Sequence, residues 1–393
     1  AGNLTVDGGA ASCTVNALGF AGNGGTLNIL NGGALIVDTL DTTPATVNLN
    51  LAQGSFETNG DLTLDIDLNL TNGSELDSGG NLSAAAQNLS FDGNGTELSV
   101  DGQLDCNDLS VFNNATSSLD GVSNIGGDLS VSSSGRVDFG SAPAATAVDV
   151  AGTLDVTTSG RINNNFVLTA DDGATTIDGG VFNNFGQFVG TGQPLTIKNS
   201  TWAGNGSVAC GTMLIDTGAT AIMGGQVTVA GQLKVDANNT TLGFGTASAG
   251  TAVDLGGAVI IEDGGTLNNF FDVTADDGTT TLQNHGTLNN HRLYNAAGQN
   301  FNMVISTYTG AGQLNCQNLN VNNSSTATFE GVVNATGTFK VDNTSTCSFG
   351  TATAATAIDL GNTVMVDNAS TLNVYFDVTA DDDGVRVAWS VTG

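Results

Sequence analysis

Positive charge is scarce in this sequence. Its 393 residues include 7 Lys and Arg against 38 Asp and Glu, which gives a formal net charge of −31. Because no basic patch is available to neutralise phosphates, we expect no nucleic-acid partner, and the same reasoning weighs against an anionic membrane surface. The surplus of carboxylates is compatible with divalent cations and with repulsion between protein surfaces.

Long apolar runs and good helix formers are also missing. No run of eighteen apolar residues occurs, so we expect no membrane-spanning segment. Asp, which favours turns, outnumbers Glu, and the usual helix formers are too sparse to build amphipathic helices. Disorder is disfavoured because 39% of the residues are hydrophobic and recur at regular spacing. The chain opens at Ala1 rather than Met, which fits a processed, secreted protein.

The sequence does contain a long internal repeat. An interval of 105 residues separates equivalent positions in two series, Phe139, Phe244, Phe349 and Ala170, Ala275, Ala380. Upstream, residues 102–106 closely match residues 312–316. We therefore divide the chain into a degenerate segment, 1–101, and three repeats, 102–205, 206–311 and a shortened 312–393. Nothing marks a linker between the copies, which favours one continuous solenoid.

Each repeat contains smaller units of about twenty residues. Within a unit, apolar and polar residues alternate in short runs, such as Leu129 with Val131, and Gly, Asn, Asp and Ser separate the runs. Alternation with a period of two indicates β-strands, and the separating residues indicate turns. One unit cannot bury its apolar face alone, whereas stacked units pair every strand with the next and bury a continuous core.

The sequence therefore predicts an all-β fold, a right-handed parallel β-helix (β-solenoid) of roughly 19 coils, since 393 residues divided by about 21 gives that number. With a strand spacing of about 4.8 Å, the coils would form an elongated rod on the order of 90 Å long. The handedness follows the general preference of parallel β connections. The alternative is an array of antiparallel β-sandwich domains, which the abundance of Gly and Asn and the scarcity of Pro disfavour.

An Ala-Asp-Asp turn is the sharpest recurrent polar feature. Adjacent carboxylates in a turn are weak candidates for calcium, which takes about six to eight oxygen ligands, because one turn supplies few of them. Copies five coils apart lie roughly 24 Å from one another by strand spacing and cannot share an ion. We favour solvated Asx turns and expect no cofactor. The candidate residues are Asp171, Asp172, Asp276, Asp277, Asp381 and Asp382.

No catalytic constellation stands out. Parallel β-helices include polysaccharide lyases and hydrolases with acidic and basic residues in a surface groove, but the basic residues here are scattered and the repeats stay regular. Lys234 and Lys340 occupy equivalent positions, which suits a repeated surface residue. His285 and His291 lack cysteine or clear carboxylate partners and make a poor zinc site. We therefore expect no enzyme, and a polysaccharide lyase or hydrolase is the least favoured alternative.

The cysteines and the asparagine runs suit structural roles. We expect buried free thiols that act as small apolar residues, with an intermolecular bridge through Cys13 as the alternative. Cys347 takes the place of Leu242 in the preceding copy. Runs of two or three Asn suit hydrogen-bonded ladders at the corners of stacked coils. Three further cysteines lie about five coils apart, beyond disulfide reach: Cys106, Cys210 and Cys316.

Both ends of the expected solenoid carry alternating apolar residues without a polar cap. We expect these strand edges to pair, so that the C-terminal coil of one chain stacks on the N-terminal coil of the next in an open filament. The candidate assembly-edge residues are Leu4, Val6, Val385, Val387, Trp389 and Val391.

The Gly-, Asn- and Thr-rich coils and the long repeats resemble the surface β-helix proteins of bacteria, namely filamentous-haemagglutinin-like adhesins, autotransporter passengers and planctomycete-type repeat proteins. The resemblance implies a secreted or cell-surface location and structural or adhesive work. We expect an extracellular structural protein, the subunit of a self-assembling fibre, stalk or sheath whose partner is itself. The alternative is a monomeric surface adhesin that binds glycans or a cell surface through irregular coils around Trp202, Tyr294 or Tyr308.

Overall fold

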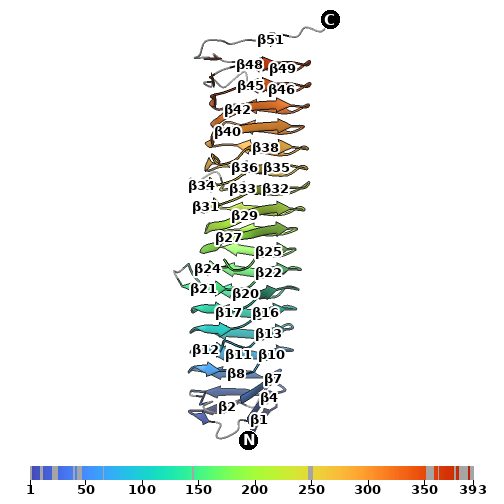
Figure 1. Ribbon diagram of the computed structural model, residues 1–393. Helices are drawn as coiled ribbons and strands as arrows, with labels where there is room; N and C mark the ends of the chain where they lie inside the picture. Colours follow the sequence, from blue (N-terminus) through green and yellow to red (C-terminus); the bar gives the residue numbers. More distant parts are fainter. Residues whose placement is uncertain are drawn as a thin grey trace. The chain divides into compact units, whose positions relative to one another are not determined.

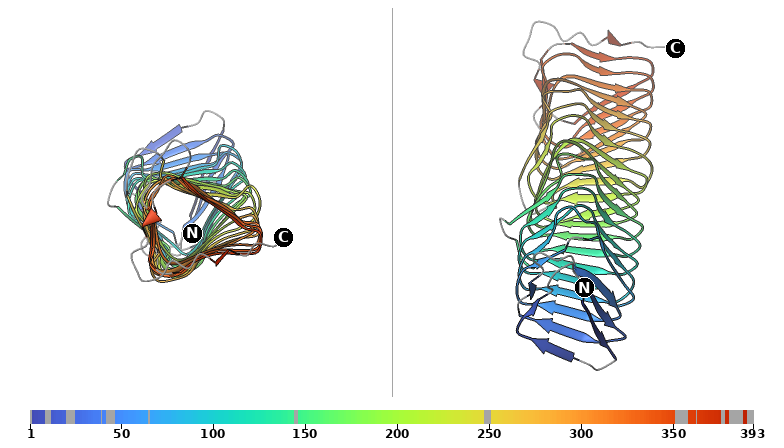
Figure 2. Two further views of the ribbon diagram at one scale, coloured as in Figure 1. Left: turned by 90° about the horizontal axis from the view of Figure 1, so that it is seen from above. Right: turned by 60° about the horizontal axis from the view of Figure 1, so that its bottom comes forward.

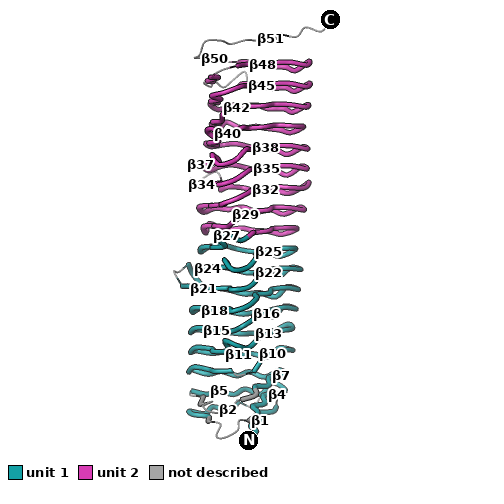
Figure 3. The backbone as a smooth tube through the Cα atoms, viewed as in Figure 1, with its two compact units in different colours: residues 1–193 teal, residues 194–393 magenta. Residues whose placement is uncertain are grey.

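The computed structural model describes residues 2–8, 12–19, 25–38, 40–41, 47–64, 66–143, 146–246, 251–350, 358–361, 363–375, 378–379 and 388–389. Within these residues all regular secondary structure is β-strand, and no helix could cross a membrane. The chain divides into two compact units, unit 1 with residues 1–193 and unit 2 with residues 194–393 (Figure 3).

In each unit the chain winds in successive turns that carry strands on three faces (Figure 1). The described strand pairings are parallel, and each joins a strand to its equivalent one turn away. Viewed along the stacking direction, the turns of a unit enclose a three-sided cross-section (Figure 2). We number the faces 1 to 3 in chain order.

The strands of unit 1 are as follows. Face 1 holds β1 (Gly2–Asp7), β4 (Gly25–Leu30), β7 (Val47–Ala52), β10 (Leu68–Thr71), β13 (Leu89–Asp92), β16 (Leu109–Phe112), β19 (Leu129–Val131), β22 (Leu154–Thr157) and β25 (Thr175–Asp178). Face 2 holds β2 (Ser12–Val15), β5 (Ala34–Val37), β8 (Ser55–Thr58), β11 (Glu75–Ser78), β14 (Glu97–Val100), β17 (Thr116–Leu119), β20 (Arg136–Phe139), β23 (Arg161–Asn164) and β26 (Val181–Asn184). Face 3 holds β9 (Leu62–Thr63), β12 (Leu82–Ala84), β15 (Leu104–Cys106), β18 (Ser123–Ile125), β21 (Ala147–Val150), β24 (Val167–Thr169) and the start of β27 (Gln187–Lys198). A separate pair consists of β3 (Leu18–Gly19) and β6 (Leu40–Asp41).

Unit 2 repeats this plan. Face 1 holds β32 (Leu233–Val235), β35 (Val259–Ile261), β38 (Thr280–Gln283), β45 (Phe339–Val341), β48 (Val364–Val366) and β51 (Ala388–Trp389). Face 2 holds β28 (Thr201–Ala203), β30 (Thr220–Met223), β33 (Thr241–Phe244), β36 (Thr266–Asn269), β39 (Thr287–Asn290), β41 (Thr307–Gly310), β43 (Thr326–Phe329), β46 (Thr346–Phe349) and β49 (Thr371–Val374). Face 3 holds β31 (Val227–Val229), β34 (Ala252–Leu255), β37 (Asp272–Thr274), β44 (Val333–Ala335), β47 (Ile358–Leu360) and β50 (Val378–Thr379). Three longer strands continue from face 3 to face 1: β29 (Ser207–Asp216), β40 (Tyr294–Val304) and β42 (Leu314–Asn322).

The predicted parallel β-solenoid is confirmed, and the β-sandwich alternative is wrong, since no described pairing is antiparallel. Equivalent strands recur at the predicted interval: β20, β33 and β46 begin at residues 136, 241 and 346, which are 105 residues apart. The number of coils is smaller than expected. In the described residues face 3 carries seven strands of the main sheet in unit 1 and nine in unit 2, so that about 16 turns have all three faces.

Two features reduce the number of turns. The pair β3–β6 stands outside the main sheet, and some turns are longer than average, such as the 25 residues between the register partners Val137 and Ile162. The right-handed winding and the division into a degenerate segment and three repeats stay predictions.

The core consists of columns of inward-facing side chains. Along most described strands buried residues alternate with exposed or half-buried ones, as the period of two predicts. Because parallel strands pair in register, an inward side chain lies over the inward side chain of the neighbouring turn. Burial of each CH2 group in such a column stabilises the fold by about 0.8 kcal/mol. On face 2 of unit 1 one column runs through Phe56, Leu76, Leu98, Ser117, Val137, Ile162 and Phe182.

The corner between faces 1 and 2 explains much of the Asn, Gly and Ser. At this corner pairs of consecutive residues adopt positive φ, for example Asn113 and Asn114 at 54° and 65°. Asn tolerates this left-handed conformation better than most residues with a Cβ atom. In unit 2, His285 occupies such a corner with φ of 71°, so its backbone role is that of a turn residue, as expected.

The large aromatic residues belong to the core. Trp202 is 1% exposed, and Tyr294 and Tyr308 are fully buried, so these three side chains belong to the core; a binding site in the coils around them stays a prediction. Their rings face inward, where Phe301 contacts both tyrosine rings edge-on at 5.9 Å between centroids. The hydroxyl groups stay hydrogen-bonded: Tyr294 Oη lies 2.9 Å from Thr280 Oγ1, and Tyr308 Oη accepts from Asn290 Nδ2 at 3.0 Å.

The cysteines confirm the expected buried free thiols. Cys106, Cys210, Cys316 and Cys347 are buried and unbridged, and Cys347 faces inward at the position that Leu242 holds in β33. Burial raises the pKa of Cys106, Cys210 and Cys316 to about 12. Only Cys13 among the five is exposed.

This arrangement predicts a single reactive thiol. In the native protein at pH 8, iodoacetamide should modify Cys13, while the other four cysteines should react only after denaturation, because a buried, protonated thiol is a poor nucleophile. Mass spectrometry of the labelled peptides measures this. Rapid native labelling at Cys106, Cys210 or Cys316 would contradict the inward orientation of those positions.

Candidate functional site

The Asp-Asp turns lie where the sequence predicts, after equivalent strands of face 3. Asp171 and Asp172 follow β24, Asp276 and Asp277 follow β37, and all four side chains are exposed. In unit 1 the backbone carbonyl of Asp171 accepts a hydrogen bond from Gln193 Nε2 at 2.8 Å, and unit 2 repeats this contact at 2.7 Å. These contacts use the backbone of the turn and leave the carboxylates at the surface. Two further candidates lie outside the described residues: Asp381 and Asp382.

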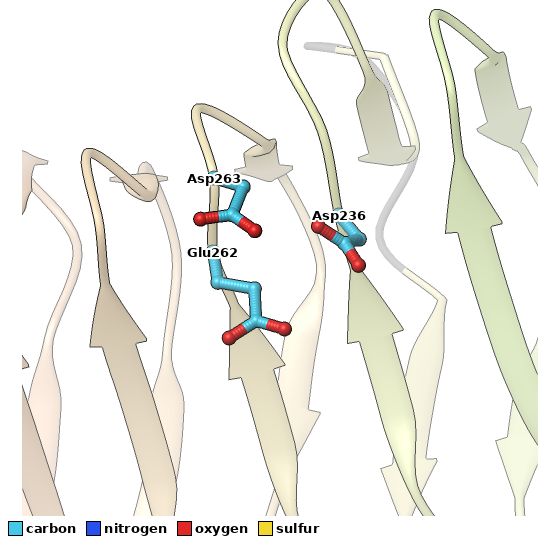
Figure 4. A group of neighbouring side chains, drawn as sticks. All are labelled: Asp236, Glu262 and Asp263. Atoms are coloured by element: carbon cyan, nitrogen blue, oxygen red, sulfur yellow. The ribbon is translucent and has the colours of Figure 1, made fainter.

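An acidic cluster that the sequence reasoning missed lies in unit 2, where β32 and β35 end (Figure 4). Asp236, Glu262 and Asp263 each offer a carboxylate oxygen, and these oxygens lie within 4.8 Å of one another. Lys234 already supplies a cation: its Nζ atom lies 2.7 Å from Asp236 Oδ2 and 2.6 Å from Glu262 Oε1. Hydrogen bonds to these two carboxylates raise the pKa of Lys234. Gln283 Nε2 donates to the second oxygen of Glu262. We therefore interpret the cluster as an internal ion-pair network rather than a metal centre.

The equivalent lysine makes the equivalent pair. Lys340 Nζ lies 2.6 Å from Asp342 Oδ2, and this contact, together with the amide of Asn368, holds the pKa of Asp342 below its ordinary value. A carboxyl group whose pKa is depressed by folding contributes stability above the unfolded pKa, and that stability is lost as pH falls through the folded pKa. Both lysines are thus surface residues fixed by their repeat position, as the sequence predicts.

A shallow groove runs along face 2 of unit 1. It consists of two adjoining hollows of about 520 and 470 Å³, and both are lined by Ser118, Arg136 and Asp138. Toward one end it reaches the carboxylates of Glu97, Glu75 and Asp77, and toward the other the ring of Phe185, which is 44% exposed. Because the groove follows six consecutive face-2 strands, its length is on the order of 24 Å by strand spacing.

A hydrogen-bonded ladder forms one wall of this groove. Arg136 contacts Asp138 with two nitrogens, Nε to Oδ1 at 2.9 Å and Nη2 to Oδ2 at 2.8 Å. Asn163 Nδ2 donates to Asp138 Oδ1 at 2.5 Å, and Asn183 Nδ2 donates to Asn163 Oδ1 at 2.7 Å. The side chains are therefore held in place by one another before any ligand arrives. Sequence reasoning missed this wall because its members are 20 to 25 residues apart and meet only through strand register.

A second set of asparagines lies inside the units, at the corner between faces 2 and 3. Asn164 and Asn269 are fully buried and occupy equivalent positions of the repeat. Asn269 Nδ2 donates to Asn290 Oδ1 at 2.9 Å, and its Oδ1 accepts from the backbone N–H of Phe271 at 3.1 Å. The predicted structural role of the Asn runs is confirmed, because these amides are buried and hydrogen-bonded within the fold.

The remaining candidates do not converge on a site. His291 stacks on Phe270 with 4.5 Å between ring centroids, which is a surface contact, and it joins no metal-ligating group in the described residues. Of the assembly-edge residues, Leu4 is half-buried and Val6 is 8% exposed in β1. Trp389 lies in β51, whose backbone pairs with β48. Three assembly-edge candidates lie outside the described residues: Val385, Val387 and Val391.

Comparison with known proteins does not add a function. No protein-family model matches the chain, and no curated protein matches it significantly.

Removal of the lysine in the acidic cluster should convert the cluster into a cation site. The substitution Lys234→Met should lower the unfolding free energy by about 1 kcal/mol, a magnitude typical of partly exposed ion pairs. Millimolar calcium should then raise the thermal midpoint of the variant and leave that of the wild type unchanged. Because the folded pKa of Lys234 is raised, the difference between the proteins should persist at neutral pH and fade only above about pH 10.4. Equal calcium responses of both proteins would contradict the internal-cation interpretation.

The buried Asn side chains should contribute more to the stability of the fold than the outward Asn side chains beside them. Asn269→Ala leaves the Phe271 N–H without its partner and should destabilise the protein by about 1–3 kcal/mol. The control Asn268→Ala removes an outward amide that accepts from Asn289 at 2.7 Å and should change stability by less than about 0.5 kcal/mol. Urea denaturation followed by circular dichroism measures both, and equal effects would contradict the assigned roles.

Proposed function

We propose that the chain is an extracellular structural protein, the non-catalytic subunit of a fibre, stalk or sheath. One observation carries this proposal: strands recur at an interval of 105 residues, and some of the side-chain contacts on their turns recur with them. Equivalent lysines form equivalent ion pairs, and equivalent Asn residues close equivalent corners. A scaffold needs this regularity because its length comes from adding equal turns.

The chemistry of the surface supports an extracellular or cell-surface location. A net charge of −31 keeps neighbouring side surfaces apart in solution, so that contacts along the stacking direction are favoured over lateral aggregation. Composition and periodicity resemble those of bacterial surface β-helix proteins, whose work is structural or adhesive.

The proposed mode of assembly is head-to-tail stacking of solenoid ends. Within the described residues, β1 pairs only with β4, β2 only with β5, and β49 only with β46. The free sides of such strands present backbone N–H and C=O groups that another chain can pair. Val374 and Tyr375, at the end of β49, are 45% and 53% exposed and offer apolar surface to a stacked partner.

Electron microscopy of the purified chain tests this mode of assembly. Negative-stain images and sedimentation velocity at increasing concentration should show end-to-end polymers one solenoid wide. The substitutions Asn3→Lys and Thr5→Lys place charges on the exposed edge strand β1 and should shorten the polymers. The control Asn69→Lys adds one positive charge, as each of these substitutions does alone, to an exposed side position of β10 and should not shorten the polymers. A chain that stays monomeric at every concentration would contradict head-to-tail stacking.

A further inference from the structure

The positive charges of unit 1 are confined to one place. Residues 1–193 contain two basic side chains, Arg136 and Arg161. They are register partners on adjacent turns of face 2, so their backbones lie about 4.8 Å apart. Both side chains are exposed. In a chain with a net charge of −31, these two guanidinium groups form a local positive patch: Arg136 lines the groove, and Arg161 extends from the adjacent turn beside it.

The patch is only half neutralised. Arg136 forms its two-nitrogen contact with Asp138. Arg161 makes no ion pair within 4.0 Å in the part of the chain that the structure describes. The carboxylate of Asp138 thus pairs with Arg136, and the positive charge of Arg161 is available to an anionic group of a ligand.

The internal repeat shows that the fold does not require these arginines. At the equivalent positions of β33 and β36 the residues are Thr241 and Thr266, and the strands still pair in register. The third copy has Thr346 and Thr371 at the same places. Where Asp138 stands in the first copy, the others have Gly243 and Ser348. The charged outward residues at the groove are therefore replaced in the other two copies of the repeat, while the strands there pair in the same register.

The rest of the groove offers hydrogen-bonding groups and one exposed aromatic ring. Ser118, Asn163 and Asn183 line it with hydroxyl and amide groups, and the Asn ladder holds two of them in fixed orientation. The ring of Phe185, 44% exposed, lies at the end of the same groove. Polar groups that fix orientation, beside an aromatic ring that packs on C–H surface, suit a sugar, which has hydroxyl groups at its rim and C–H groups on its faces.

We propose that this groove binds an extended oligosaccharide that carries carboxylate groups, as uronic acids do. A carboxylate of the ligand pairs with Arg161 and Arg136, its hydroxyl groups bond the Asn ladder, and one sugar ring packs on Phe185. The sparse positive charge fits this ligand better than nucleic acid or a densely sulfated chain, because two guanidinium groups match few anionic groups and three carboxylates, those of Glu75, Asp77 and Glu97, line the other end. This binding is independent of the proposed structural role.

Calorimetry with the full chain tests the proposal at low salt. Oligogalacturonate of six to eight sugars is the probe, and the same oligomer with its carboxyl groups reduced to alcohols is the neutral comparison. The acidic oligomer should bind at least about tenfold more tightly than the neutral one, as expected when a bidentate ion pair is lost. Raising the salt to about 0.5 M should weaken binding by a similar factor.

Variants chosen from the repeat itself provide the controls. Arg136→Thr with Arg161→Thr installs the residues of the other two copies, so the fold should persist by circular dichroism while affinity for the acidic oligomer falls at least about tenfold. Lys198→Thr with Arg292→Thr removes two positive charges outside the groove and should leave affinity unchanged. Phe185→Ala should weaken binding of both oligomers.

The outcomes decide the proposal. Absence of binding at millimolar oligogalacturonate, or equal affinity of the wild type and the arginine double variant, would overturn it. Tighter binding of a sulfated oligosaccharide than of the carboxylated one would overturn the assignment of the ligand. Monomeric protein that still binds the acidic oligomer would support this site while contradicting head-to-tail assembly.

Discussion

Register between successive turns is the constraint on which the structure depends. Each strand pairs in parallel with its equivalent one turn away, so every residue lies over one partner, such as Ser99 over Ser118 or Val137 over Ile162. A slip of one residue would turn every inward side chain outward. The inner columns of apolar residues and the buried Asn164 and Asn269 follow from this register.

The same register determines which groups lie next to the few positive charges. Lys234 and Lys340 lie in equivalent strands and are each fixed by carboxylates on the outer surface. Arg136 and Arg161 meet only because β20 and β23 pair in register. Most inner positions stay apolar from copy to copy, apart from buried polar residues such as Asn164 and Asn269, whereas outer positions change from Arg to Thr and the strands still pair in register. Stability therefore comes from the inner columns, and outer columns are free to carry binding groups.

Much of the fold could be predicted from the sequence because it depends on local periodicity. Alternation marked the strands, and the 105-residue interval placed Cys347 at the inward position of Leu242, which the structure confirms. The candidate site could not be predicted in this way. Arg136 and Arg161 are separated by a turn of 25 residues, longer than most, and their pairing in register depends on how the extra residues are accommodated.

The aromatic residues show that residue type alone does not predict which side chains reach the surface. The sequence placed an alternative binding site in irregular coils around Trp202, Tyr294 or Tyr308, but the three side chains themselves are buried. Tyr294, Phe301 and Tyr308 lie on successive faces of the winding, and Phe301 makes edge-on contacts with both tyrosine rings inside the core. Exposed Phe185, in contrast, follows a strand end, where alternation no longer assigns a face.

Engineered disulfides between turns test the register most directly. The pair Ser99→Cys with Ser118→Cys joins outward register partners of β14 and β17, whose Cα atoms lie within the range of about 4.4–6.8 Å that a disulfide spans. Oxidation of the native protein should close this bridge within one chain, seen by mass spectrometry of unreduced peptides. The pair Glu97→Cys with Ser118→Cys is two residues out of register and should stay reduced. Efficient bridging of the second pair and not of the first would contradict the stacking of turns on which the structure rests.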